Sequence, residues 1–256
     1  TGPVRVDPAT APHQVKLILD GAGVEIARGD DPCILPKARK TEAEITATKA
    51  AHIRDGVAMA RFLHWLDDTA PGGGLTEIDC ARKLEAFREE TGALRDISFD
   101  TISAAGAHAA LPHYRVSEAS NATLTPGEVY LVDSGGQYLD GTTDITRTIA
   151  IGEPSEEVKS AFTQVLRGMI AIHRLRFPKG LAGQHLDAFA RAPLWAAGRD
   201  FDHGTGHGVG VFLSVHEGPQ RLSRISKTVL EPGMILSNEP GYYREGHFGI
   251  RIKNLI

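Results

Sequence analysis

The sequence predicts an α+β fold in which helices pack against a sheet. Helical patterns come in pairs, one pair in the first half of the chain and one pair further on, and strand patterns follow each pair. Helices and strands grouped in separate stretches are typical of this class. The repeated order also predicts two pseudo-equivalent halves. The strands expected after residue 40 are 98–103, 129–133, 144–151, 234–238 and 249–255.

Length and composition set broad limits. A chain of 256 residues is long enough for one large domain, or for one domain and part of another. A hydrophobic content of 41% and a charged content of 23% are typical of soluble globular proteins. The net charge of -4 gives no electrostatic reason to expect nucleic acid or a membrane as a partner. The two cysteines, Cys33 and Cys80, argue against a disulfide framework and favour a cytoplasmic location.

The first 39 residues are expected to form a small separate piece. Their patterns predict a strand at 4–6, a helix at 12–21 and a strand at 24–27, followed by a turn-rich connector at 29–36. This piece is too small to bury a core alone. No apolar run has the length of a membrane span, and no signal-peptide pattern opens the chain. Because the sequence does not start with Met, we expect it to begin inside a longer gene product.

Four longer helices are predicted from their caps and apolar spacing. Thr41 and Glu44 form a capping-box pattern at the start of the first helix, and Thr76 begins the second. The third helix is expected at 155–174, where a serine provides the cap, and the fourth at 184–197. The apolar residues at helical spacing are Ile53, Val57, Ala60 and Leu63 in the first helix, and Ile78, Leu84 and Phe87 in the second.

Two aspartates lie eleven residues apart at the ends of adjacent predicted strands. Asp133 ends the apolar run 129–132, and Asp144 begins the next strand after a turn at Gly141. Such a step between antiparallel neighbours can bring both carboxylates to one point. An Asp near Gly is also a common turn residue, so neither position identifies a metal site alone. Oxygen donors joined by one imidazole fit Mn²⁺, Co²⁺ or Zn²⁺.

Histidines gather in a glycine-rich stretch. His203, His207 and His216 lie in HGTGHGVGVFLSVHEGP, where the glycines allow close backbone approach to a ligand. His113 occurs earlier, in LPHY, and Glu239 follows in NEPGYY. A lone histidine is usually a hydrogen-bonded structural residue, so the order and context of the whole set carry the interpretation.

In order and context these residues resemble the dinuclear metallopeptidases of the pita-bread fold, which include methionine aminopeptidase, prolidase and aminopeptidase P. The segments HGTGHGVG, VHEGP, NEPGYY and FGIRI are most similar to aminopeptidase P. The resemblance covers residues 40–256 and implies a curved, mainly antiparallel sheet covered by helices, in two halves. It implies that residues 1–39 are the tail of a preceding non-catalytic domain and a linker. It also implies that family members continue beyond the position of Ile256.

The implied activity is the metal-dependent release of an N-terminal residue from short peptides that have proline second. In the family two divalent ions share a bridging water and lower its pKa, and Mn²⁺ is favoured over Co²⁺ and Zn²⁺ here. The resemblance leaves the oligomeric state open between a monomer and the homodimer common in the family. It implies the metal ligands Asp133, Asp144, His207 and Glu239, the catalytic residues His113, His216, Glu239 and Arg251, and the substrate-binding residue His203.

Lys253 stands where the family expects a metal-bridging glutamate, fourteen residues after Glu239. Strand alternation places Lys253 on the same face as Arg251, so it should point into the site, although a solvent-exposed lysine at a frayed end is the alternative. Three carboxylates and one ammonium carry a net charge that balances a single divalent ion. An ammonium cannot ligate metal but can stand in for an ion among carboxylates. The sequence therefore predicts one ion or none, and weak or absent peptidase activity.

Three other functions are compatible with the same fold. A non-enzymatic pita-bread module for peptide or protein binding would not need the catalytic histidines that this chain keeps. A metal-independent hydrolase of the creatinase branch would lack the full carboxylate set. Prolidase is the nearest neighbour within the enzyme class, and the similarity of HGTGHGVGVFLSVHEGP and NEPGYY favours aminopeptidase P.

Overall fold

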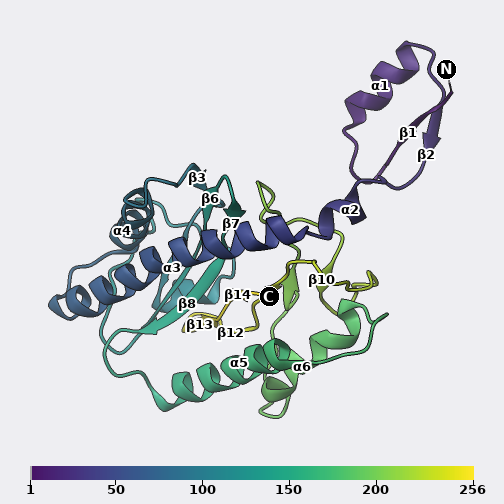
Figure 1. The fold of residues 1–256 in the computed structure, drawn as a ribbon. Coiled ribbons are helices and arrows are strands. Elements are labelled where there is room, and N and C mark those ends of the chain that lie inside the picture. The colour runs from purple at the N-terminus through teal and green to yellow at the C-terminus, as the bar shows by residue number, and fades with distance from the viewer. Residues whose placement is uncertain (1) are drawn as a thin grey trace. The chain divides into compact units, whose positions relative to one another are not determined.

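The computed structural model describes residues 2–256, and the chain divides into two compact units, one ending at Lys37 and one spanning Ala38–Ile256 (Figure 1). The division lies two residues before the boundary expected from the sequence. In the first unit β1 (Val4–Val6) and β2 (Ile26–Arg28) pair in parallel, with α1 (His13–Gly21) between them. Helix α1 buries none of its residues, as expected for a piece too small to form a core.

The connector after β2 is more ordered than the sequence suggested. A turn-rich segment was expected over 29–36, but α2 forms at Ile34–Ala38. The expectation of a turn-rich segment was wrong for residues 34–36, which are helical. Proline is tolerated in the first turn of a helix, where its missing N–H has no intrahelical partner, and Pro36 is the third residue of α2.

Helix α3 (Glu42–Thr69) opens the second unit with the predicted capping box. The amide of Glu44 donates to the Thr41 hydroxyl at 3.3 Å, and the amide of Thr41 donates to the Glu44 carboxylate at 2.8 Å. The predicted apolar stripe is not the buried one, however, because Ile53 and Val57 are 73% and 56% exposed. The buried residues of α3 are Thr48, Ala51, Asp55, Ala58, Met59, Phe62 and Leu66.

Packing partners explain which stripe of α3 is buried. Asp55 accepts two hydrogen bonds from Arg88 and one from the Tyr138 hydroxyl, all within the interior. A buried carboxylate is stable only when it is paired in this way, and the pair fixes the rotation of α3 against its neighbour. That neighbour is α4 (Glu77–Glu89), which begins at the predicted cap Thr76. The short 3₁₀ helices η1 (Ala70–Gly72) and η2 (Gly106–Ala110) complete this half.

The central sheet is antiparallel, with strand order β4-β5-β8. Its strands are β4 (Ile102–Ala105), β5 (Val129–Ser134) and β8 (Ile145–Ala150). The expected strand 98–103 is broken, since β3 (Asp96–Ile97) belongs to a second small sheet with β6 (Gly136–Tyr138) and β7 (Gly141–Thr142). All of β5 is buried because α3 and α4 cover it on one side and β13 packs near it on the other.

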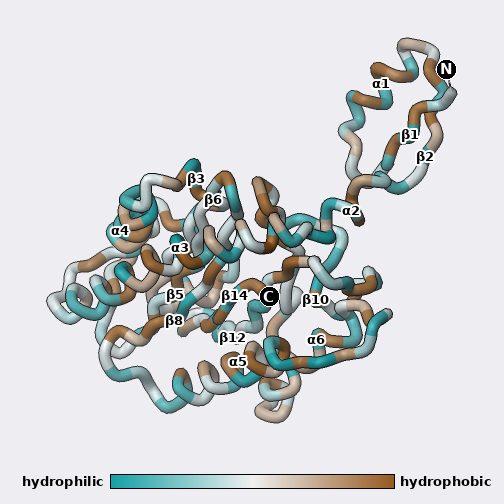
Figure 2. Tube along the Cα trace, viewed as in Figure 1, coloured by the Kyte–Doolittle hydropathy of each residue, from teal (hydrophilic) through white to brown (hydrophobic). Residues whose placement is uncertain are grey.

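The second half repeats the order of helix pair and strands. Helix α5 (Glu156–Arg174) starts at its predicted serine cap, and α6 (Gly183–Trp195) packs against it. Hydrophobic and hydrophilic positions alternate along α5, as Figure 2 shows, and its apolar side joins a core with residues of β5 and β13. The strands of this half are β9 (Gly206–His207), β10 (Arg221–Leu222), β11 (Ser237–Asn238), β12 (Gly241–Arg244), β13 (Phe248–Arg251) and β14 (Asn254–Leu255).

The last predicted strand is divided in two. The sequence suggested one strand over 249–255, but β13 pairs with β12 and β14 pairs with β11. Between them Lys253 forms an antiparallel bridge with Thr146, the second residue of β8. This crossing carries the C-terminal segment from one sheet to the next past the end of β5. Among the helices of residues 2–256, none has the length and apolar character needed to cross a membrane.

Gly249 of β13 provides a test of how closely the strands and η2 approach. A Cβ at this position would lie 1.7 Å from the carbonyl oxygen of Ala109. Gly249→Ala should therefore lower the free energy of unfolding by about 1–3 kcal/mol, the usual cost of overpacking. The measurement is chemical denaturation of the purified chain.

Gly56 supplies the matched control, because a Cβ there would meet nothing within 4 Å. In the interior of α3, Gly56→Ala should raise the free energy of unfolding by about 1 kcal/mol through helix propensity. Equal stability of Gly249→Ala and the parent chain would contradict the close approach of β13 and η2.

Candidate functional site

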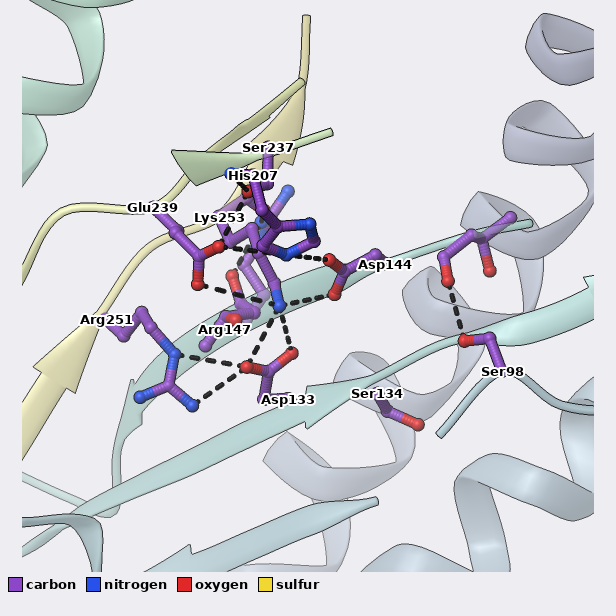
Figure 3. Close-up of polar contacts among 12 residues, drawn as sticks. Ser98, Asp133, Ser134, Asp144, Arg147, His207, Ser237, Glu239, Arg251 and Lys253 are labelled. Carbon is purple, nitrogen blue, oxygen red and sulfur yellow. Dashed lines mark hydrogen bonds and ion pairs between the residues drawn. The ribbon is translucent and has the colours of Figure 1, made fainter. Parts of the chain in front are cut away.

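Three carboxylates meet at the end of the central sheet. Asp133 lies on β5, and Asp144 directly precedes β8, whose pairing sets Asp133 opposite Thr146. Glu239 directly follows β11, and its amide donates to the Thr205 carbonyl at 2.8 Å. Figure 3 shows the three carboxylates directed at one point. The eleven-residue step between antiparallel strands thus brings the two aspartates together as the sequence suggested.

The point where the carboxylates meet is the side-chain nitrogen of Lys253. Lys253 Nζ lies 2.8 Å from Asp133 Oδ1 and 3.8 Å from Glu239 Oε2, and it also contacts Asp144 Oδ1. The residue is 3% exposed, so the alternative of a solvent-exposed lysine is wrong. Burial alone would lower the pKa of Lys253, but the carboxylates of Asp133, Asp144 and Glu239 raise it, which keeps the ammonium charged.

Arg251 contacts the same cluster and points to the same side of the chain as Lys253. Its guanidinium donates to Asp133 Oδ2 at 2.8 and 3.1 Å, while Lys253 holds the other oxygen. Burial would raise the pKa of Asp133, yet the charges of Lys253 and Arg251 hold it below its usual range. Both cations therefore point toward Asp133, as strand alternation predicted.

His207 faces two of the carboxylates. Its Nδ1 lies 2.9 Å from the carbonyl oxygen of Gly208, so Nδ1 is the donor there and Nε2 is directed at the cluster. Nε2 is 3.2 Å from Glu239 Oε1 and 3.4 Å from Asp144 Oδ2. Burial opposes a charge on His207, but its contacts with Asp144 and Glu239 raise its pKa to about 9. The two carboxylates thus favour the charged form of the ring.

A hydrogen-bonded chain links the cluster to His203. Arg251 Nη1 donates to the Tyr243 hydroxyl at 2.8 Å, and that hydroxyl lies 2.7 Å from His203 Nε2. His203 Nδ1 lies 2.8 Å from the carbonyl oxygen of Gly204, which can only accept, so we infer that Nδ1 carries the proton. Burial lowers the pKa of His203 and favours this neutral form. Tyr243 then donates to Nε2, which fixes the ring at the edge of the cleft.

His216 and His113 line the cleft above the cluster. The ring of His216 packs edge-on against that of His207, with 4.2 Å between ring centroids, and burial together with the charge of His207 lowers the pKa of His216. His113 lines the same cleft, which has a volume of about 670 Å³. All nine predicted site residues, from His113 to Lys253, therefore line one cleft. The apolar residues Phe99, Ile102 and Pro112 line it as well.

One feature of the site was not predicted from the sequence. It is the buried ion pair of Arg191 and Asp187 behind the histidines, which we call the clamp. Arg191 of α6 donates to the carbonyl oxygens of Phe201 and His203, and it pairs with Asp187 one turn earlier on the helix. The Thr205 hydroxyl donates to Asp187 at 2.8 Å. The clamp thus fixes the backbone that carries His203 and His207. An Asp–Arg pair four residues apart is visible in the sequence, but such pairs are usually on a helix surface.

The arrangement of donors can be compared with what a divalent ion requires. In the part of the chain that the structure describes, no three His, Cys, Asp or Glu side chains are arranged to hold one metal ion. The reason lies in the cluster itself, since Lys253 Nζ occupies the space between the carboxylates and an ammonium has no lone pair to offer a metal. The residues present here therefore do not fit a metal centre.

The fold and the carboxylate–histidine cluster define the class of the pita-bread domains. Residues 46–256 match metallopeptidase family M24, and the chain belongs to this family. It is 47% identical to Xaa-Pro aminopeptidase 1 of Dictyostelium discoideum over 233 residues, and 49% identical to aminopeptidase P2 of Arabidopsis thaliana over 228. Each match covers 88% of this chain but only 37% and 32% of the relative, so the chain spans about a third of their length.

Solved structures agree with this assignment. The X-prolyl aminopeptidase of Caenorhabditis elegans, described as a cytosolic enzyme with a di-nuclear active site, superposes with a TM-score of 0.86 at 41% identity. That match covers 90% of this chain and 38% of the other. The prolidase of Pyrococcus furiosus superposes with a TM-score of 0.85 at 28% identity, covering all of this chain and 72% of the other. The predicted α+β pita-bread fold is confirmed.

The clamp behind the histidines makes a stability prediction. Arg191→Met would leave Asp187 buried without its partner, so the free energy of unfolding should fall by about 3–5 kcal/mol. Arg115→Met is the matched control, because the Arg115 side chain is 80% exposed and its pair with Asp100 is a surface one. Its loss should cost at most about 1 kcal/mol. Equal losses in the two variants, measured by denaturant titration, would contradict a buried clamp.

Proposed function

We propose that this cleft binds short peptides with proline second, as an Xaa-Pro aminopeptidase-type site, and that Lys253 weakens or abolishes release of the N-terminal residue. The observation that carries the substrate class is the convergence of His113, His203 and His216 around one cleft. The names of relatives that are 47% and 49% identical support the same class.

The cleft has the residues that such a substrate needs. Proline has a fixed φ and no amide N–H, so its ring is recognised by fit against apolar surface, which Phe99, Ile102 and Pro112 provide. His216 packs against His207 at the cluster, where its ring would donate to a developing oxyanion. His113 would contact the scissile amide, and His203, which is held by Tyr243, would lie beside the bound proline.

The identity of the metal and the cellular location are also proposed. With glutamate at position 253, the centre would have four carboxylates and the imidazole of His207, a donor set suited to Mn²⁺. The description of the Caenorhabditis elegans relative as cytosolic supports a cytoplasmic location for this chain. Neither nucleic acid nor a membrane is expected as a partner.

Peptide binding without hydrolysis is the second candidate function. One observation favours it, namely that Lys253 fills the centre while the histidines of the cleft remain in place. Under this alternative the parent chain binds proline peptides, and the Lys253→Glu variant also fails to cut them. Prolidase activity differs in substrate length, because it would be confined to dipeptides.

The substrate class can be tested with paired peptides. Short peptides with proline second should bind the parent chain in calorimetry, and Lys253→Glu with Mn²⁺ should cleave them at least about tenfold faster than peptides with alanine second. Orders of magnitude more turnover in Lys253→Glu than in the parent is expected. Equal cleavage of the alanine series would indicate a general aminopeptidase, and cleavage of dipeptides alone would indicate prolidase.

The roles of His216 and His113 can be tested in the Lys253→Glu background. His216→Ala and His113→Ala should each raise the barrier by about 2.7–4 kcal/mol, as loss of one oxyanion donor does, while thermal stability changes little. His64→Ala is the control, because the His64 side chain is 80% exposed on α3. Turnover numbers and melting temperatures are compared across the three variants. Turnover close to that of the His64 control would refute the role of the histidine concerned.

A further inference from the structure

We propose that Lys253 is a built-in cation that takes the place of metal at this centre, so that the folded chain excludes divalent ions there and is complete without them. The sequence allowed one ion or none, and the geometry of the centre favours none. This inference concerns the cluster alone and does not depend on the substrate class proposed above. It rests on the position of one atom, on how firmly that atom is held, and on the donors left around it.

The position of Lys253 Nζ coincides with where a shared ion would have to lie. Both oxygens of Asp133 contact it, at 2.8 and 3.1 Å, and so does Oδ1 of Asp144. Metal–oxygen bonds of divalent ions are about 2.0–2.6 Å long, so an ion bonded to the same oxygens would overlap the ammonium. Like charges at such a distance also repel strongly in a buried site. Lys253 and a shared ion are therefore alternatives.

Lys253 is held so that it cannot easily move aside. Its amide and carbonyl both bond to Thr146, at 3.2 and 3.4 Å, and its carbonyl also accepts from Arg147 at 3.0 Å. The ring of Phe99 lies 5.3 Å from Nζ on the cleft side, in a cation–π contact. Displacement by an ion would require the ammonium to leave its carboxylates within a buried site, which is unfavourable.

The donors away from Lys253 do not make a second place for an ion. They are His207 Nε2, Glu239 Oε1 and Asp144 Oδ2, and among residues 2–256 no three such side chains are arranged to hold one ion. The Ser237 hydroxyl also donates a hydrogen bond to Glu239 Oε1 at 2.6 Å. Lys253 and Arg251 already neutralise most of the charge of the three carboxylates, so little attraction is left to offset the dehydration of a divalent ion.

Metal content and metal-dependent stability test this inference directly. The chain, Lys253→Glu and Lys253→Met are equilibrated with Mn²⁺, gel-filtered, and analysed for bound metal. Thermal unfolding of each is then compared in Mn²⁺ and in EDTA, since a ligand that binds the native state raises the melting temperature. Exposed Lys227→Glu makes the same charge change outside the cluster and serves as the control.

The parent chain and Lys227→Glu should contain less than about 0.1 Mn²⁺ per chain and melt at the same temperature in Mn²⁺ and in EDTA, because no ion stabilises their native state. Lys253→Glu should bind Mn²⁺ and melt several degrees higher with it, as expected for about 1–3 kcal/mol of binding linkage. Lys253→Met should melt lower than the parent in EDTA and regain stability with Mn²⁺. These readouts do not depend on peptide cleavage, so a wrong substrate class would leave them unchanged.

A stoichiometric Mn²⁺ ion in the parent chain that is lost in His207→Ala would overturn the inference. So would a parent melting temperature that rises in Mn²⁺ and falls in EDTA. If Lys253→Glu did not fold, the titration of the parent chain with Mn²⁺ and the Lys253→Met comparison would still decide the question.

Discussion

The double pairing of Asp133 with Arg251 and Lys253 is the interaction on which the centre depends. Three carboxylates cannot be buried side by side unless cations lie among them, because each uncompensated charge loses its hydration. Here the cations come from the last residue of β13 and from the segment that follows it, so the same contacts that neutralise β5 also fasten the second half of the domain to the first. Charge balance and the joining of the two halves are one structural feature.

The positions of the histidines depend on this cluster, because other side chains link the two by hydrogen bonds. Arg251 orients Tyr243, which orients His203, while Ser237 bridges Glu239 and the amide of His207. Behind them the pair of Asp187 and Arg191 holds the backbone of the glycine-rich stretch. Glycines permit the close approach of this segment, and the buried polar network removes the freedom that those glycines would otherwise leave.

The sequence alone was sufficient for features governed by local chemistry. The capping box of Thr41, the serine cap of α5 and the meeting of Asp133 with Asp144 follow from spacing and side-chain type. It was insufficient where distant partners decide. Ile53 and Asp55 lie on different faces of α3, and distant partners of Asp55, Arg88 and Tyr138, favour burial of the face with Asp55. The break at Lys253 is likewise set by its bridge to Thr146, a partner that no local pattern reveals.

The pairing of Lys253 with Asp133 also has a consequence for the order of folding. It joins residues 120 positions apart, and contacts of such separation form late because the intervening chain must first lose its freedom. Until then Asp133 and Asp144 are like charges on neighbouring strands with no counter-ion from the protein, and water must solvate them. The central sheet therefore carries its own electrostatic repulsion until the second half closes over it. A molecule whose ionic centre is assembled has, for that reason, completed both halves.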